Sequence, residues 1–72
     1  MYPKEKMARL KGLYMEPVYL VPLKKTCPRK GWYIAAALTD GLDLYRGGCG
    51  YISYKDCGVL YDVYLVEEQI PI

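Results

Sequence analysis

Of all side chains in this sequence, the thiol of Cys27 has the neighbours that could best activate it as a nucleophile. Four basic residues lie within three positions of it, namely Lys24, Lys25, Arg29 and Lys30. Nearby cations lower the pKa of a thiol and favour the nucleophilic thiolate. A cysteine nucleophile also needs a general base, however, and the chain contains no histidine. We therefore expect no catalytic residue and predict that the protein is not an enzyme.

Other residue types used in catalysis and in metal sites do not occur in the necessary patterns. Ser53 is the only serine, and no histidine is present to complete a catalytic triad with it. Zinc sites draw four ligands from cysteine and histidine, usually in close pairs, but Cys27, Cys49 and Cys57 are widely spaced. Residues 46–50 are rich in glycine, yet they connect two predicted strands, whereas a phosphate-binding loop opens a helix. We expect neither a metal nor another cofactor.

The basic residues are concentrated in the first part of the chain. Residues 1–30 carry eight bases and two acids, and residues 31–72 carry two bases and six acids. The net charge of +2 is thus +6 (8 − 2) in the first part and −4 (2 − 6) in the second. The cluster Lys24, Lys25, Arg29 and Lys30 could bind phosphates of a nucleic acid. The alternative is a solvated, charged loop that protects an edge strand from aggregation, and the low net charge favours this alternative.

Tyrosine occurs nine times and phenylalanine not at all. The candidates for a partner-binding surface are Tyr33, Tyr45, Tyr51 and Tyr64. Aromatic side chains on an exposed sheet can anchor a protein partner or stack on single-stranded bases. Packing inside the fold or within a homodimer is the simpler alternative. We expect Asp43 and Asp62 on the same face, where they would repel phosphates, so we favour a protein partner.

These side chains must be positioned by β structure. Strand formers and turn residues alternate after residue 31 and predict strands at about 32–38, 42–45, 51–54 and 59–68. Earlier in the chain, Pro17 and Pro22 predict that the segment 8–23 forms an edge strand or two short strands, because proline cannot donate to a ladder. A helix over 32–44 is the alternative suggested by the three consecutive alanines.

The first predicted turn sets the register of the first hairpin. A three-residue loop with Gly41 in the left-handed conformation pairs Leu38 with Leu42 and Ala36 with Leu44. A two-residue Asp-Gly loop would instead mix core and solvent side chains on one face. We therefore prefer the three-residue loop.

The next two turns extend this register to the last strand. They place Leu44 opposite Ile52 and Tyr54 opposite Val59, so that all three hairpins agree on one core face. That face holds Trp32, Ile34, Ala36, Leu38, Leu42, Leu44, Ile52, Tyr54, Val59, Tyr61, Val63 and Leu65. The segment 8–23 is expected to fold over this face.

The combined pattern predicts an all-β fold: a small antiparallel meander of five to six short strands that forms a curled sheet or a partly open SH3-like or OB-like barrel. Seventy-two residues are enough for one small domain. We expect residues 1–7 to be a flexible basic N-terminal arm and residues 8–72 to be a single β domain.

The cysteine count and the hydropathy pattern indicate a cellular location. Three cysteines without a signal peptide are typical of a cytoplasmic protein, and the longest apolar stretch, 32–38, is too short to cross a membrane. Gln69 is the only amide side chain, which is a weak indication of a thermophilic source.

We expect a small, non-catalytic binding module that docks a protein partner through its tyrosines and uses the basic cluster for steering. Two alternatives stay open. One is a single-stranded nucleic-acid-binding β-barrel, and the other is a homo-oligomeric structural protein, for which a homodimer is the simplest form. Short chains without a catalytic set are frequent among accessory and inhibitor proteins of viruses and mobile elements, and we expect this protein to be one of them.

Overall fold

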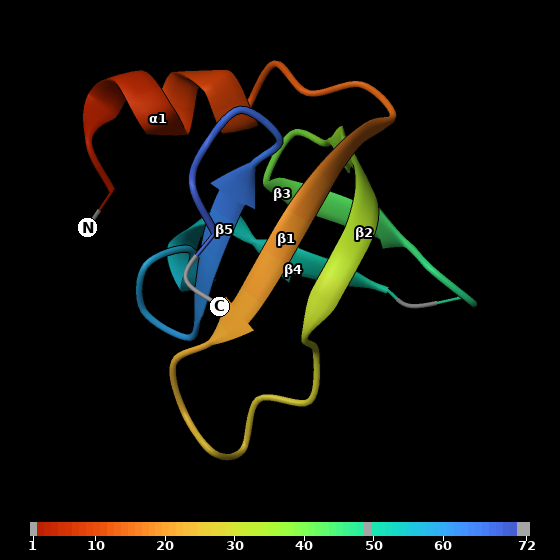
Figure 1. Ribbon diagram of the computed structural model, residues 1–72. Coiled ribbons are helices and arrows are strands. Elements are labelled where there is room, and N and C mark those ends of the chain that lie inside the picture. The colour runs from red at the N-terminus through yellow and green to blue at the C-terminus, as the bar shows by residue number, and fades with distance from the viewer. Residues whose placement is uncertain (1, 49, 71–72) are drawn as a thin grey trace.

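The computed structural model describes residues 2–48 and 50–70 of the chain (Figure 1). Its main element is a five-stranded antiparallel sheet made of β1 (Glu16–Pro22), β2 (Gly31–Ala37), β3 (Gly41–Tyr45), β4 (Tyr51–Ser53) and β5 (Tyr61–Leu65). A short helix, α1 (Lys4–Leu10), precedes the sheet, and a 3-10 helix, η1 (Tyr54–Asp56), joins β4 to β5. The prediction of an all-β fold is confirmed.

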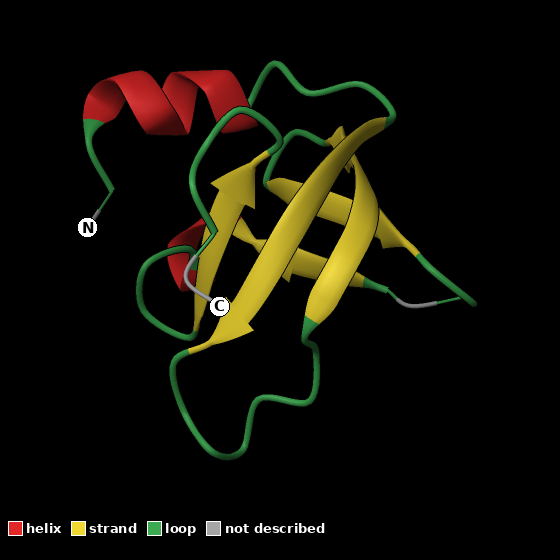
Figure 2. Ribbon diagram, in the orientation of Figure 1, coloured by secondary structure: helices red, strands yellow, loops and turns green. Residues whose placement is uncertain are grey.

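The strands are arranged in the order β4-β3-β2-β1-β5. The first four strands form a meander, and the sheet curls so strongly that β3 and β4 cross behind β1 and β2 (Figure 2). The expected hairpin between β4 and β5 is wrong. After η1 the chain crosses to the other end of the sheet, where β5 pairs with β1 and Leu20 faces Val63. The result is a strongly curled antiparallel sheet whose last strand returns to pair with the first.

Strand β1 is not the expected edge strand or lid, because it lies in the middle of the sheet between β2 and β5. Pro17 is the second residue of β1 and Pro22 is the last, so the missing N–H groups fall near the ends of the ladder. Between them, Val18 and Leu20 are completely buried. The prolines therefore limit the length of this strand and do not prevent its central position.

The register between β2 and β3 differs by one residue from the prediction. The structure pairs Ala37 with Leu42 and Ala35 with Leu44, where Ala36 was expected opposite Leu44. The turn centres on Thr39 and Asp40, since the N–H of Leu38 donates to the carbonyl of Gly41 at 2.7 Å. Because side chains alternate along a strand, this shift turns every side chain of β2 to the opposite face.

Gly41 belongs to β3 and does not occupy the left-handed turn position that was expected for it. A Cβ at Gly41 would overlap the ring of Tyr51 and would lie 2.5 Å from the carbonyl oxygen of Ile52. The glycine is needed here because β3 and β4 approach each other closely. In the β3–β4 ladder, Ile52 pairs with Leu42 and not with the expected Leu44. Because this is a shift of two residues, the side chains of β4 stay on the predicted faces of the sheet.

The core fills the inner side of the curled sheet. Its fully buried side chains are Leu10, Val18, Leu20, Ala35, Leu42, Leu44 and Val63. Tyr33 is 3% exposed and belongs to this core, whereas Trp32, which was expected inside, is 44% exposed. Leu38 and Val59, also expected inside, are about half exposed.

Helix α1 replaces most of the flexible arm that was expected at residues 1–7. Its sequence consists of good helix formers and follows Pro3, a residue that suits a helix start. Met7 and Leu10 lie one turn apart on the same side of α1, and both pack against the core. The helix therefore supplies the lid that we had assigned to the segment 8–23.

Candidate binding surface

The outer face of the sheet carries a row of aromatic side chains, one from each strand. This aromatic row consists of Tyr19, Trp32, Tyr45, Tyr51 and Tyr64. Tyr19 of β1 is paired with Trp32 of β2 on one side and with Tyr64 of β5 on the other. The rings of Tyr19 and Trp32 meet edge to face, with centroids 5.3 Å apart. Paired residues lie on the same face of a sheet, so these three rings are neighbours.

The other two rings continue the row across β3 and β4. Tyr45 pairs with Ile34, which lies two residues after Trp32 on β2, and Tyr51 pairs with Asp43, which lies two residues before Tyr45 on β3. Tyr45 and Tyr51 are 46% and 40% exposed. The row therefore crosses the whole sheet, with its most exposed rings on β2, β3 and β4.

Three of the four predicted partner-binding tyrosines belong to this row, namely Tyr45, Tyr51 and Tyr64. The assignment of Tyr33 is wrong, because the one-residue shift in register turns its ring into the core. Trp32 takes its place for the same reason. Tyr19 was missed because β1 was expected at an edge or over the core, although its alternation with buried Val18 and Leu20 was visible in the sequence.

Each of the three tyrosines that lie on the outer face, as predicted, interacts with an acid. The hydroxyl of Tyr64 donates to Asp62 at 2.7 Å. A hydrogen bond to Asp43 raises the pKa of Tyr45 above its usual value. Partial desolvation and the nearby charge of Asp40 do the same for the pKa of Tyr51. The outer face thus combines protonated phenols with carboxylates.

A shallow groove of about 310 Å³ lies in the middle of the row, where Trp32 of β2 and Tyr45 of β3 both line it. We name it the Trp32 groove, and its lining consists of Pro17, Trp32, Tyr33, Ile34, Tyr45 and Arg46. The guanidinium carbon of Arg46 lies 4.4 Å from the centroid of the Tyr33 ring. The Nη2 of Arg46 also donates to the hydroxyl of Tyr33 at 3.3 Å. The ring of Tyr33, although buried, therefore supports a positive charge at the surface.

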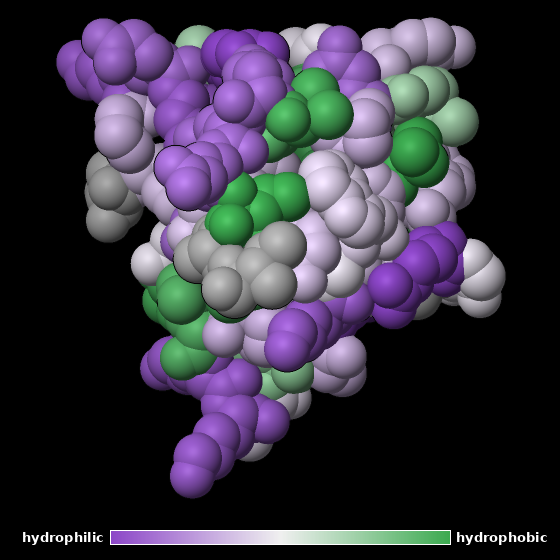
Figure 3. Space-filling view, in the orientation of Figure 1, coloured by the Kyte–Doolittle hydropathy of each residue, from purple (hydrophilic) through white to green (hydrophobic). Residues whose placement is uncertain are grey.

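The loop that carries the predicted basic cluster leads into this groove, since Trp32 lies two residues after Lys30. Lys24, Lys25, Arg29 and Lys30 belong to the loop between β1 and β2, which forms the lower tip of the molecule and is strongly hydrophilic (Figure 3). A Cβ on Gly50, in the loop between β3 and β4, would lie 3.4 Å from Nη2 of Arg29. The two loops are therefore in contact, and Arg46 becomes a fifth base at this end.

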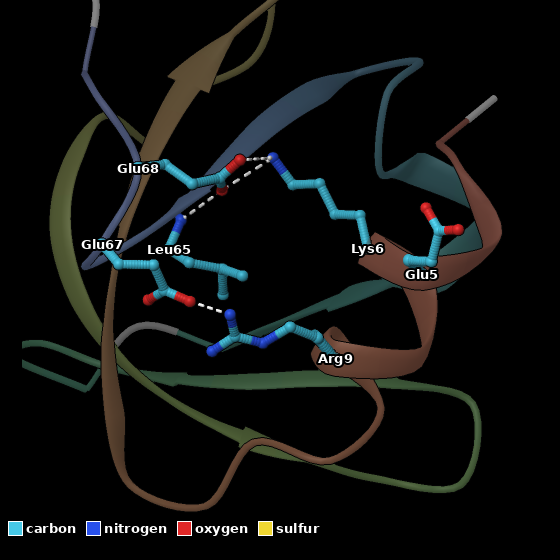
Figure 4. Close-up of a pocket in the computed structure, with 6 residues that line it drawn as sticks. All are labelled: Glu5, Lys6, Arg9, Leu65, Glu67 and Glu68. Carbon is cyan, nitrogen blue, oxygen red and sulfur yellow. Dashed lines mark hydrogen bonds and ion pairs between the residues drawn. The ribbon is translucent and has the colours of Figure 1, made fainter.

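The remaining N-terminal bases are largely used within the fold. Lys6 of α1 pairs with Glu68, with 2.9 Å between Nζ and Oε1, and Arg9 pairs with Glu67 (Figure 4). The hydroxyl of Tyr2 donates to Asp62 and accepts from the N–H of Val63. The N-terminal and C-terminal segments are thus joined by these contacts. Two of the N-terminal bases are neutralised by acids of the C-terminal part.

The carboxylate of Glu68 makes these contacts dependent on pH. Partial burial would raise the pKa of Glu68, but hydrogen bonds from the backbone N–H of Leu65, at 2.8 Å, and from Lys6 outweigh it, so the pKa lies below its usual value of 4.5. A carboxyl with a lowered pKa stabilises the fold above its unfolded-state pKa, and this contribution is lost as the pH falls through the folded-state value.

We predict that Glu68→Gln lowers the free energy of unfolding at neutral pH by less than about 1 kcal/mol, because the pair is partly exposed. The wild type and the variant should converge only when the pH falls below the lowered, folded-state pKa of Glu68, since the wild-type carboxyl is then protonated. Thermal unfolding followed by circular dichroism at several pH values measures this, with Glu16→Gln as the matched control at an exposed acid. A constant difference at all pH values would contradict the assignment.

The structure describes two of the three cysteines, Cys27 and Cys57. Cys57 is buried, and desolvation raises the pKa of its thiol to about 11, so it is mostly protonated at neutral pH. Cys27 is half-buried, and both thiols are free. The expectation for Cys49 lies outside the described residues. Within residues 2–48 and 50–70, no group of three or more His, Cys, Asp or Glu side chains lies together.

Comparisons with protein-family models, with curated proteins and with solved structures find no match for this chain. In the part of the chain that the structure describes, no helix has the length and apolar character needed to span a bilayer. What the surface can bind must therefore be argued from its own geometry.

Proposed function

We propose that this protein is a small, non-catalytic binding module that docks a protein partner through the aromatic row. The observation that carries the proposal is that the row crosses all five strands and keeps three of its rings at least 40% exposed. Exposed rings of this kind are the residues that most often dominate the energy of a protein interface. Since these three rings stay exposed, they contribute less to the core than they could contribute to an interface.

The acids on the same face favour a protein over a nucleic acid. Asp43 lies directly opposite Tyr51 in the β3–β4 ladder, and Asp62 holds the hydroxyl of Tyr64. A polyphosphate chain that followed the row would pass these carboxylates and be repelled. A protein surface can instead present donors to the same carboxylates. The free thiols of Cys27 and Cys57 fit an intracellular partner.

A second candidate, binding of single-stranded nucleic acid, is favoured by one observation. Trp32 is exposed beside Arg46 and the basic loop, and this combination stacks bases and binds phosphates in other proteins. Fluorescence anisotropy with labelled oligonucleotides at low and high salt tests it. Binding that weakens steeply with salt would support this candidate against the first.

The proposal is tested by affinity capture from the native cell extract with tagged protein. We expect the double variant Tyr45→Ala/Tyr51→Ala to reduce recovery of the partner at least about tenfold, because each ring should contribute more than about 1 kcal/mol. Val66→Ala is the control, since Val66 is 61% exposed but lies outside the row. Equal recovery by the double variant would rule out the aromatic row as the docking surface.

Self-association is examined with the same variants. Light scattering of the purified protein should show a monomer if the row is reserved for another protein. A stable dimer that the double variant Tyr45→Ala/Tyr51→Ala dissociates would instead assign the row to a homo-oligomeric contact.

A further inference from the structure

The guanidinium of Arg46 is held in place, and no carboxylate of residues 2–48 and 50–70 forms an ion pair with it. It stacks on the ring of Tyr33 and donates one hydrogen bond to the Tyr33 hydroxyl. On its other side, Gly31 at φ 108° allows a close approach, because a Cβ there would lie 2.9 Å from Nη1 of Arg46. An arginine has five N–H donors in a planar fork, so most of them remain available. The two ion pairs of the described residues involve other bases.

The surroundings of this guanidinium are basic on one side and aromatic on the other. The loops 23–30 and 46–50 contain five bases and no acid. The indole of Trp32 and the ring of Tyr45 line the same groove as the arginine. A guanidinium that is held by Tyr33 and opens into an aromatic groove suits a carboxylate that is attached to an apolar body, because the fork binds the charge and the rings bind the body.

The distribution of charge along the outer face limits what can bind. Negative charge is favoured at the Trp32 groove, but it is opposed further along β3, where Asp43 lies, and near Tyr51, where Asp40 raises the pKa of the phenol. A nucleic acid carries its charges at regular spacing and would meet both regions. A peptide can place its acids over the basic end alone.

We propose that the Trp32 groove binds a short acidic segment of the protein partner, with one carboxylate on Arg46 and an adjacent side chain against Trp32. The bases of the β1–β2 loop contact further acids of the same segment and accelerate its association. This inference rests on the proposed function and deepens it, because it assigns a chemistry to the part of the partner that lies on the basic end.

Trp32 is the only tryptophan of the chain, so its fluorescence reports on the groove directly. The probe is hexaglutamate with blocked ends, compared with hexaglutamine and with an oligothymidylate that carries the same number of negative charges. We expect hexaglutamate to change the emission of Trp32 saturably at low salt, hexaglutamine to leave it unchanged, and the oligothymidylate to bind more weakly. Arg46→Gln should weaken the binding of hexaglutamate about tenfold or more.

Two further variants separate recognition by Arg46 from general charge. Arg46→Lys keeps the charge but loses the planar fork, and it should recover only part of the affinity. Lys55→Gln removes a base outside the groove, and it should change the affinity less than about twofold. Because Arg46 packs on the buried Tyr33, thermal unfolding of each variant confirms that it is folded under the titration conditions.

Failure to change the emission of Trp32, equal binding by Arg46→Gln, or tighter binding of the oligothymidylate would each overturn the inference. The last outcome would also favour the nucleic-acid candidate. If Arg46→Gln captures the partner like the wild type while Tyr45→Ala/Tyr51→Ala does not, the proposed function stands and only the acidic segment is wrong. If neither variant affects capture, the proposed function itself fails.

Discussion

Replacing Tyr33 with alanine should lower the free energy of unfolding by about 3–5 kcal/mol, whereas replacing Trp32 should lower it by only about 1 kcal/mol. Tyr33 is 3% exposed and its removal leaves a large cavity in the core, while Trp32 is 44% exposed and loses mainly its edge-to-face contact with Tyr19. The two residues are neighbours in the sequence, so the comparison tests the register of β2 directly. The register expected from the sequence predicts the reverse order.

Urea unfolding followed by circular dichroism measures both values. A domain of this length has a total stability of about 4–11 kcal/mol, so Tyr33→Ala can unfold it completely. Tyr33→Phe keeps the ring and removes only the hydroxyl that accepts from Arg46, which should cost about 1 kcal/mol. If Trp32→Ala proved more damaging than the two variants of Tyr33, the inward position of this ring would be wrong.

Replacing Leu10 with alanine should lower the free energy of unfolding by about 2–5 kcal/mol. Leu10 is the last residue of α1 and is completely buried against the sheet, so its side chain closes the core. The transition midpoint in a thermal scan should fall by about 10 °C or more.

Ala8 provides the matched control for this helix. It is exposed on α1, so Ala8→Gly removes no core contact but should still cost about 1 kcal/mol if the segment is helical in the native state. Loss of stability in both variants would establish a docked helix. Unchanged stability in both would mean that α1 contributes nothing to the folded domain.

The alternation of apolar and polar residues was enough to predict β structure, because this pattern depends only on neighbours along the chain. It located the four strands after residue 31, although the connection between β4 and β5 is a crossover through η1 and not the expected hairpin. It also assigned Tyr45, Tyr51 and Tyr64 to the outer face, because their strands alternate clearly between apolar and polar positions. These parts of the candidate site follow from local sequence.

The face of β2 could not be predicted in this way. One side of the strand carries Trp32, Ile34 and Ala36, and the other carries Tyr33, Ala35 and Ala37, so both sides are apolar. Which side is inside depends on the turn at Thr39 and Asp40 and on the neighbouring strands, which bury Leu44 opposite Ala35. Ala35 is completely buried in the curled core, where its side chain takes up little space. The much larger side chain of Trp32 lies on the opposite face of β2.

The all-β character of the chain, most of its strands and three outward tyrosines could be predicted from the sequence, because they depend on short-range patterns. Three-dimensional packing places β1 at the centre of the sheet, Trp32 instead of Tyr33 on the surface, and α1 over the core. It also decided that Lys6 and Arg9 are neutralised by Glu68 and Glu67, while Arg46 joins the loop bases at the other end. Each of these features depends on contacts between residues that are far apart in the chain. Patterns among neighbouring residues therefore do not reveal them.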